Sequence, residues 1–531
     1  MNTMSRRQVL LAGLGVASTG ALSACGLKTG SSASASGSTS PLALPTQSPL
    51  SPSSGAHTVT KTLTPRQLTL DLGGVKATTW AYHDELDTPV LRATAGDLLR
   101  IRVDNKLPAS TSVHWHGIAL RNASDGVPGV TQQPIDPGTR FTYEFVAPDP
   151  GTYFFHPHSG VQIDRGLHAP LIIDDPREPG DYDREWIITL DDWTDGIGKS
   201  PDDILAAFKK QNGPVSTGMG SMGGMHGSSM PSSGGMGGMG GMDGSSSMPS
   251  ASSSGMGSMA GSSGMASSPL GDAGDVTYPH YVLNGRVPAA PRTLTGKPGD
   301  KVRLRIINAG SDTIFKIALS GHVLTVTHAD GYPVTPTKAT SVYLAMGERL
   351  DATVTLGDGV FVLAAAPEGK KGTPARAIVR TGSGSVPAPT ATIAELSSTA
   401  LLATQLAPAP SEKLPDRNPD QTLEVQLNGQ MDPYGWGLNG KKFGEDTPLR
   451  ATRGQRVRLT MTNMTMMAHP MHIHGHTWAL PGSNGLRKDT VLIPPMQTIQ
   501  ADLQADNPGT WMLHCHNIYH AELGMMTTLR Y

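Results

Sequence analysis

Three segments, far apart in this chain, repeat one pattern: a glycine, then alternating apolar and polar side chains, then an asparagine. They span residues 96–105, 299–308 and 454–463. Alternation with a period of two is typical of a β-strand with one buried face, and the leading glycine favours a turn. Because the copies are separated by the length of a domain, they predict three similar β-domains rather than a solenoid of short repeats.

A second repeat links only the first and third of these domains. Residues 114–117 read His-Trp-His-Gly and residues 472–475 read His-Ile-His-Gly, while 151–158 and 509–516 both run from Gly-Thr to a His-x-His pair. The corresponding middle stretch, 359–366, carries alanines where the histidines would be. We therefore expect the chemistry to reside in the first and third domains, with the middle domain as a spacer.

The histidines of this repeat form four His-x-His pairs. In a β-strand, residues i and i+2 point to the same face, so each pair can direct two imidazoles at one site. Eight imidazoles are too many for one ion and suit a cluster of ions. Imidazole binds Cu, Zn, Fe and Ni, so this spacing alone does not choose the metal. The pairs are His114/His116, His156/His158, His472/His474 and His514/His516.

The C-terminal segment does choose a metal. Cys515 lies between the two histidines of the last pair, His520 and Met525 follow it, and His469 begins the run His-Pro-Met-His-Ile-His. One cysteine, two histidines and a methionine form the ligand set of a blue-copper site, in which the thioether is a weak axial ligand. The sequence therefore indicates copper.

Together these motifs are similar to the four signatures of the three-domain multicopper oxidases, and the resemblance covers nearly the whole chain beyond its N-terminal segment. It implies an all-β fold of three cupredoxin-like Greek-key β-barrel domains. It also implies an enzyme that takes electrons singly from a donor and delivers four of them to dioxygen. The implied cofactors are four copper ions: one type 1, one type 2 and a binuclear type 3 pair.

The resemblance assigns each ligand a role. It implies a type 1 copper held by His469, Cys515, His520 and Met525, and a type 2 copper held by His114 and His472. It implies a type 3 pair held by His116, His156, His158, His474, His514 and His516. The cluster would then lie between the first and third domains, in agreement with the repeat. Because Cys515 is the neighbour of two type 3 ligands, an electron would have a covalent route of one residue to the cluster.

Oxygen reduction also requires protons, and the family supplies them through acids. Asp125 matches an acid that family members place near the trinuclear site. A second acid often follows the last type 1 histidine directly, but here that position is Ala521, so Glu522 is the candidate replacement. In copper-efflux members, a methionine just before the first type 1 histidine helps to bind Cu(I). Met467 matches that methionine, whereas Thr465 stands where those members have an acid.

A methionine-rich segment bears on the electron donor. Between Met219 and Met265, methionines recur among glycines and serines, a composition that opposes a stable helix. Thioether is a soft ligand that selects Cu(I). We therefore favour a cuprous oxidase that acts in copper tolerance; the alternatives are a laccase-like phenol oxidase and a non-catalytic copper-buffering protein. The net charge of -2 offers no basic surface for nucleic acid.

The N-terminus carries a targeting pattern. Arg6 and Arg7 form a twin-arginine motif, and the apolar stretch 9–16 is too short to span a bilayer. Residues 22–25, Leu-Ser-Ala-Cys, resemble a bacterial lipoprotein signal, which implies cleavage before Cys25 and lipidation of its thiol. The mature protein would then be exported and anchored to the outer face of the cytoplasmic membrane. The alternative is an ordinary secretory peptide, from which Cys25 would be discarded.

Composition and motifs predict the following division of the chain. The ranges are a signal peptide at 1–24, a flexible tether at 25–55, cupredoxin domain 1 at 56–195, a Met/Gly/Ser-rich low-complexity segment at 212–274, cupredoxin domain 2 at 275–382, a linker at 383–419 and cupredoxin domain 3 at 420–531.

The lipid anchor gives the first testable prediction. Changing Cys25 to Ala should release the protein from the membrane fraction into soluble form, because no thiol would remain to carry the lipid. Fractionation and intact-mass measurement of the N-terminus check this. An unmodified N-terminus downstream of Cys25 in the native protein would contradict the anchor.

Overall fold

The computed structural model describes residues 50–86, 89–178, 180–211, 213–216, 268–415 and 417–531. The predicted signal peptide, Cys25 and the methionine-rich run from 219 to 265 lie outside these described residues. Among the described residues, no helix is both long and apolar enough to span a membrane.

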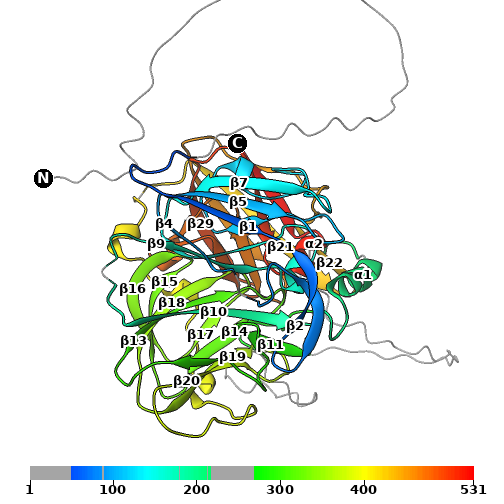
Figure 1. The fold of residues 1–531 in the computed structure, drawn as a ribbon. Helices are drawn as coiled ribbons and strands as arrows, with labels where there is room; N and C mark the ends of the chain where they lie inside the picture. The colour runs from blue at the N-terminus through cyan, green and yellow to red at the C-terminus, as the bar shows by residue number, and fades with distance from the viewer. Residues whose placement is uncertain (1–49, 87–88, 179, 212, 217–267, 416) are drawn as a thin grey trace, which may run out of the picture. The chain divides into compact units, whose positions relative to one another are not determined.

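The described chain folds into three β-modules (Figure 1). In module 1, one sheet contains β1 (Thr58–Leu63), β5 (Leu98–Asp104) and β7 (Arg140–Val146), the other contains β4 (Leu91–Thr94), β9 (Ala169–Asp174), β8 (Gly151–His156) and β6 (His114–His116), and β2 (Arg66–Asp71) pairs with β3 (Lys76–Ala81).

Modules 2 and 3 each contain a six-stranded and a five-stranded sheet. The six-stranded sheet of module 2 contains, in order, β11 (His280–Leu283), β10 (Arg184–Trp193), β13 (Lys301–Asn308), β18 (Arg349–Thr355), β15 (Leu324–Ala329) and β16 (Tyr332–Ala339). Its five-stranded sheet contains, in order, β12 (Thr293–Thr295), β20 (Ala375–Arg380), β19 (Val360–Pro367), β14 (Phe315–Leu319) and β17 (Val342–Leu344). The six-stranded sheet of module 3 contains, in order, β22 (Tyr434–Leu438), β21 (Gln421–Met431), β24 (Arg456–Asn463), β29 (Thr498–Gln504), β26 (Trp478–Leu480) and β27 (Leu486–Lys488). Its five-stranded sheet contains, in order, β23 (Leu449–Arg450), β31 (Met526–Arg530), β30 (Thr510–Cys515), β25 (His469–Ile473) and β28 (Thr490–Ile493).

Helices are few and short. The α-helices of the described chain are α1 (Pro201–Gln211) and α2 (Ile518–Glu522). The 3-10 turns are η2 (Asn122–Ser124), η3 (Gln162–Arg165), η4 (Ala394–Ser397), η5 (Ala403–Gln405), η6 (Pro410–Glu412) and η7 (Pro481–Ser483).

The three repeat segments form the equivalent strands β5, β13 and β24. Each pairs in parallel with one neighbour (β1, β10 or β21) and antiparallel with the other (β7, β18 or β29). Mostly β structure in three modules of related strand order confirms the predicted all-β, cupredoxin-like fold.

The asparagine that ends each repeat has the same structural role in all three modules. Asn105, Asn308 and Asn463 are fully buried. The Oδ1 atom of each accepts a bond of 2.9 Å from the backbone N–H two residues on, and Nδ2 donates to at least two backbone carbonyls, one of them four or five residues on and the other at least 30 residues on. A buried amide that satisfies three backbone groups fixes the loop after the strand, which explains why the pattern ends at this residue type.

One expectation for the repeat strands is wrong in the middle copy. In β5, Leu99, Ile101 and Val103 are buried and the intervening arginines are exposed, as one buried face requires. In β13, however, Arg303 and Arg305 are also buried. They pair with Asp351, whose carboxylate lies 2.6 Å from Arg303 and 3.3 Å from Arg305, so β13 is covered on both faces.

The predicted end of domain 1 at residue 195 is corrected by the sheet topology. Strand β10 pairs with β13 and β11 in the six-stranded sheet of module 2. The boundary between modules 1 and 2 therefore lies before Arg184.

Two segments predicted to be outside the domains pack against them. Part of the predicted linker 383–419 packs against module 2, where the Leu401 N–H donates to Ser341 O and the Ala409 N–H donates to Pro333 O. The described flanks of the low-complexity segment both contact module 3: Gly213 N donates to Tyr434 O at 2.9 Å, and Asp272 N donates to Met466 O at 3.0 Å.

Candidate metal centre

The four histidine pairs come from two equivalent strand pairs. In module 1, β6 lies antiparallel to β8 with His114 opposite His156, and in module 3, β25 lies antiparallel to β30 with His472 opposite His514. The same pairing exists in module 2 between β14 and β19, but there Lys316 faces an alanine. The fold thus repeats three times, whereas the imidazoles occur only in modules 1 and 3.

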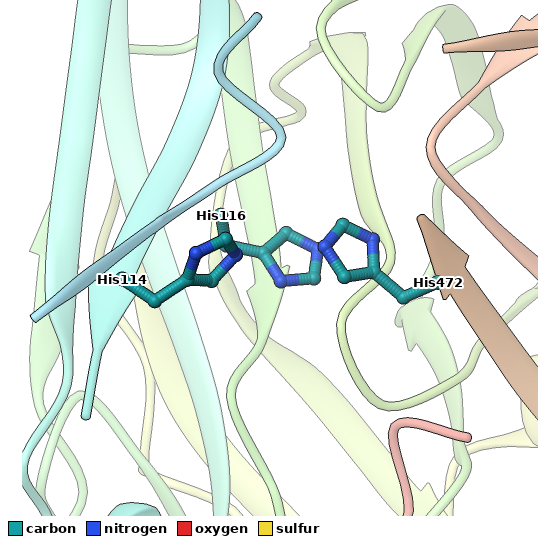
Figure 2. A group of neighbouring side chains, drawn as sticks. All are labelled: His114, His116 and His472. Carbon is teal, nitrogen blue, oxygen red and sulfur yellow. The ribbon is translucent and has the colours of Figure 1, made fainter. Parts of the chain in front are cut away.

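The structure brings all eight histidines together. Their ring nitrogens form three groups in which the atoms lie within 4.8 Å of one another; the groups are His114/His116/His472, His116/His156/His516 and His158/His474/His514. Figure 2 shows the first group, with rings from module 1 and module 3 converging on one point. Each group contains residues of both modules, so the cluster exists only where the two modules meet.

Stacking across this junction holds the rings in place. His116 stacks on His472 with ring centroids 3.8 Å apart, and His114 stacks on His474 at the same distance. Burial lowers the pKa below the ordinary histidine value for His116, His156, His158, His472, His474, His514 and His516. These rings are therefore neutral and carry a lone pair, which is the form that binds a metal.

Four of the eight cluster rings, those of His114, His116, His156 and His472, have one nitrogen bonded to the protein and the other buried without a partner among the described residues. The Nδ1–H groups of His114, His156, His472 and His514 donate to the carbonyls of Asp125, Pro157, Asp489 and Cys515 at 2.8 to 3.0 Å. The Nε2 atoms of His114, His156 and His472 are buried without a partner among the described residues. Buried polar atoms are rarely left unpaired, so this donor set fits metal ions.

Two carboxylates contact the cluster. Asp125 Oδ2 lies 3.0 Å from His474 Nδ1, and Asp125 Oδ1 lies 3.3 Å from His114 Nδ1. Asp489 Oδ1 lies 3.4 Å from His116 Nε2 and 3.5 Å from His472 Nδ1. Burial alone would raise the pKa of Asp489, but Arg349 outweighs it and holds that pKa well below the usual range. The Arg349 guanidinium therefore favours the ionised form of Asp489.

The middle module also reaches the cluster, contrary to its expected role as a spacer. Gly347, in the loop before β18, has a φ of +81°, and a Cβ placed there would lie 2.7 Å from the His516 ring and 3.1 Å from the His116 ring. A side chain at this position would displace both imidazoles. Module 2 therefore forms part of the wall of the cluster.

A second group lies inside module 3. Cys515 Sγ is 3.6 Å from His469 Nδ1 and 3.7 Å from His520 Nδ1, and all three side chains are fully buried. Met525 is also fully buried, and its backbone pairs with Cys515 and His520. Burial raises the pKa of the Cys515 thiol, so a bound cation is needed to hold the thiolate form. The residue set fits the predicted copper–thiolate site.

The outer nitrogens of these two histidines are bonded by residues that the sequence motifs missed. His520 Nε2 lies 2.7 Å from Asp275 Oδ2, and His469 Nε2 lies 2.8 Å from Thr465 Oγ1. Trp436 stacks on His520 with centroids 4.1 Å apart. Asp275 and Trp436 belong to no local motif. Thr465 was identified only as a departure from the family pattern, yet it occupies the position from which a side chain reaches His469.

Glu522 is the one predicted acid for which the described contacts give no link to the cluster. It ends α2, where burial raises its pKa and Lys209 of α1 opposes that shift. Its role in proton delivery stays a prediction.

Comparison with known proteins decides the family. Three family profiles, each described as Multicopper oxidase, match residues 64–178, 184–384 and 416–531. The chain is a multicopper oxidase. Its cofactor is therefore copper, and its reaction is an oxidation coupled to dioxygen.

Individual relatives match this multicopper oxidase over most of both chains. It is 44% identical to multicopper oxidase MmcO of Mycobacterium tuberculosis, over 99% of this chain and 96% of that protein. It is 28% identical to copper resistance protein A of Pseudomonas syringae pv. tomato, over 87% of this chain and 91% of the relative. A crystal structure of a multi-copper oxidase from Pseudomonas thermotolerans matches with a TM-score of 0.63 and 25% identity, over 90% of this chain and 99% of the other.

The contact of module 2 with the cluster gives a prediction. Gly347→Ala should lower the copper content of the histidine cluster, because the new methyl group would push against His516 and His116. Gly454→Ala is the matched control, since Gly454 has a similar φ of +91° but open space around its Cβ position. Both variants should lose about 1–2 kcal/mol of stability from the backbone conformation. Equal copper content in the two variants, measured by elemental analysis, would contradict the role of Gly347.

Proposed function

We propose that this multicopper oxidase oxidises Cu(I) to Cu(II) in copper tolerance and passes the electrons to dioxygen, which is reduced to water. The observation that carries the oxidase part is the position of Cys515, whose thiol joins one metal group while its neighbours His514 and His516 join the other. Four bound copper ions would supply the one-electron steps and the binding of dioxygen.

The ligand groups support a specific assignment. His469, Cys515, His520 and Met525 would hold a type 1 copper, and His114 and His472 a type 2 copper. The triads His116/His156/His516 and His158/His474/His514 would each hold one copper of the type 3 pair. Support comes from the geometry, since these two triads are groups whose nitrogens lie within 4.8 Å of one another.

The chain provides two short connections between the thiolate site and the cluster. One is covalent, through the backbone on either side of Cys515. The other is a hydrogen bond of 2.8 Å from His514 Nδ1 to the Cys515 carbonyl oxygen. Both connections are buried within β30 and the turn after it, so their lengths are fixed by secondary structure.

Asp125 is the side chain best placed to handle protons at the cluster. Its carboxylate contacts His114 and His474, which stack on each other. Asp489 instead contacts the other stacked pair, His116 and His472. Asp489 is unsuited to release a proton, because its ion pair with Arg349 keeps it ionised. We therefore assign proton delivery to Asp125, with Glu522 as the second candidate.

A small cavity next to the thiolate site supports Cu(I) as the substrate. It measures about 20 Å³, enough for one water-sized particle, and its lining includes Met346, Met467, Asp272 and Glu368. Thioethers select Cu(I), and carboxylates add negative charge that attracts a cation. Met467 is two residues from His469 in the chain, so an ion held there would lie next to a type 1 ligand.

The surroundings of this cavity also connect it to the methionine-rich segment. The described flank after that segment lines the cavity with Leu270 and Asp272, and it continues to Asp275, which binds His520. A phenol would need an exposed edge of His520, but this histidine is fully buried beneath Asp275 and Trp436. The geometry thus favours the cuprous oxidase over the laccase-like alternative. Export with a lipid anchor on Cys25 completes the proposal and rests on the sequence alone.

The thiolate assignment is tested by Cys515→Ser. This variant should lose the intense blue absorption and all oxidase turnover, because no other thiolate exists near His469 and His520 among the described residues. His114→Ala is the contrasting variant: it should keep the blue absorption and lose oxygen reduction. Visible spectra and oxygen uptake measure both effects, and a blue Cys515→Ser protein would refute the assignment. A colourless variant with full turnover would also refute it.

The substrate assignment is tested by Met467→Leu. Leucine keeps the apolar volume and removes the thioether. The KM for Cu(I) should rise by about tenfold, which corresponds to roughly 1.4 kcal/mol of binding, while oxidation of a phenol should be unchanged. Met461→Leu is the matched control, because Met461 is a fully buried core methionine outside the cavity lining. An unchanged KM for Cu(I) in Met467→Leu would favour the laccase-like phenol oxidase over the cuprous oxidase.

A further inference from the structure

A group of fully buried charges lies where module 2 meets the histidine cluster. It consists of Asp330, Glu348, Arg349, Lys488 and Asp489, whose side chains are at most 3% exposed. Desolvating five charged groups costs several kcal/mol per ion, and well-packed apolar side chains often serve stability as well. A requirement other than stability is therefore the better explanation for this group.

We propose that Asp489, held by Arg349 of module 2, is the positioning residue that determines which ring nitrogens of His116 and His472 face the copper ions. This inference rests on the proposed trinuclear site. It assigns to the middle module, which contributes no ligand, a direct role in the chemistry of the cluster.

The two histidines present opposite nitrogens to the segment Asp489–Thr490. His116 faces it with Nε2, which lies 3.2 Å from Thr490 Oγ1 and 3.4 Å from Asp489 Oδ1. His472 faces it with Nδ1, which lies 3.0 Å from both Asp489 O and Thr490 Oγ1. The nitrogens left without a partner are Nδ1 of His116 and Nε2 of His472.

A carboxylate and a carbonyl only accept hydrogen bonds, and the Thr490 hydroxyl donates its own proton to Asp489 Oδ1 at 2.9 Å, so all three groups retain the proton on the histidine nitrogen that faces them. The lone pair is then on the opposite nitrogen of each ring. Since the rings of His116 and His472 stack at 3.8 Å, a rotation of one would disturb the other. The Asp489–Thr490 dipeptide therefore determines which ring nitrogen is free to bind a metal, both in His116 of module 1 and in His472 of module 3.

Arg349 holds the Asp489 carboxylate in this orientation. Its Nη1 and Nη2 atoms each donate to one carboxylate oxygen at 2.6 Å, and its Nε donates to Thr152 O at 3.1 Å. The guanidinium thus bonds all three modules, since Thr152 is in module 1 and Asp489 is in module 3. It has no space to move towards Gly117, where even a Cβ would lie 2.4 Å from Nη2 and 2.6 Å from Asp489 Oδ2.

Asp330 holds the backbone of the same dipeptide. Its Oδ2 accepts hydrogen bonds from the N–H groups of Asp489 and Thr490, at 3.2 and 3.1 Å, and its Oδ1 accepts one from Arg349 N at 3.0 Å. Module 2 therefore determines the place of both the Asp489 side chain and the Asp489 carbonyl. These are the atoms that His116 and His472 contact.

The test compares copper binding by the full-length enzyme and its Asp489→Asn variant. The amide keeps the shape of the carboxylate but can turn an N–H towards either histidine. Loss of such an outer contact should weaken copper binding at the cluster by about 10- to 100-fold, measured by competition with a chelator. The type 2 electron paramagnetic resonance signal of the remaining copper should change, while the blue absorption of the Cys515 site should stay. Arg349→Lys keeps the charge without the two-pronged contact, so it should fold and show a smaller loss in the same direction.

Asp351→Asn is the matched control for a merely structural effect. Asp351 is an equally buried carboxylate that pairs with Arg303 at 2.6 Å and accepts a bond from Thr152 Oγ1 at 2.7 Å. This variant should lose stability and keep the wild-type copper affinity and type 2 signal. Wild-type affinity and signal in Asp489→Asn would overturn the inference, and so would equal losses in both Asn variants. Failure of the wild-type cluster to bind copper would instead refute the proposed function.

Discussion

The cluster depends on different roles for the two nitrogens of an imidazole ring. In His114, His116, His156 and His472, the protein partner of one ring nitrogen is a carbonyl, a carboxylate or a hydroxyl, and the other nitrogen is buried without a partner among the described residues. Such an arrangement is stable only when something occupies the free lone pairs, because buried unpaired polar atoms are costly. Strand register, stacking across modules and the close approach of Gly347 all follow from the need to keep these rings in place.

The fold and the ligands could be predicted from the sequence because both depend on short-range periodicity. A spacing of two residues places both imidazoles of a pair on one face of a strand, and alternation marks the repeat strands, whatever the rest of the chain does. The Asp489–Arg349 pair could not be predicted in this way, since its members are separated by 140 residues and neither lies in a repeated pattern. The same holds for Asp275 and His520, which are 245 residues apart.

The middle module has no metal ligands, but it still supports the cluster that the other two modules form. Module 2 keeps the strand pairing of β14 and β19 but has alanines there, and its burial pattern in β13 changes from one face to two. Arg305 of β13 then donates to Thr152 of module 1 at 3.0 Å, and Arg349 at the start of β18 donates to Thr152 of module 1 and to Asp489 of module 3. The divergence of module 2 from the repeat is thus what allows it to support the junction between the other two.

The distribution of the cluster over both ends of the chain has a consequence for biosynthesis. The His116–Thr490 contact joins residues 374 positions apart, so the ribosome must complete almost the whole polypeptide before that contact can form. A nascent first module would expose half a set of imidazoles for most of the time of synthesis, and contacts of such long range form late in folding. Correct metal incorporation must therefore follow completion of the chain, and a partly made protein can acquire ions in an incomplete and unselective half-site. A compartment that delivers copper only to finished protein would avoid this error.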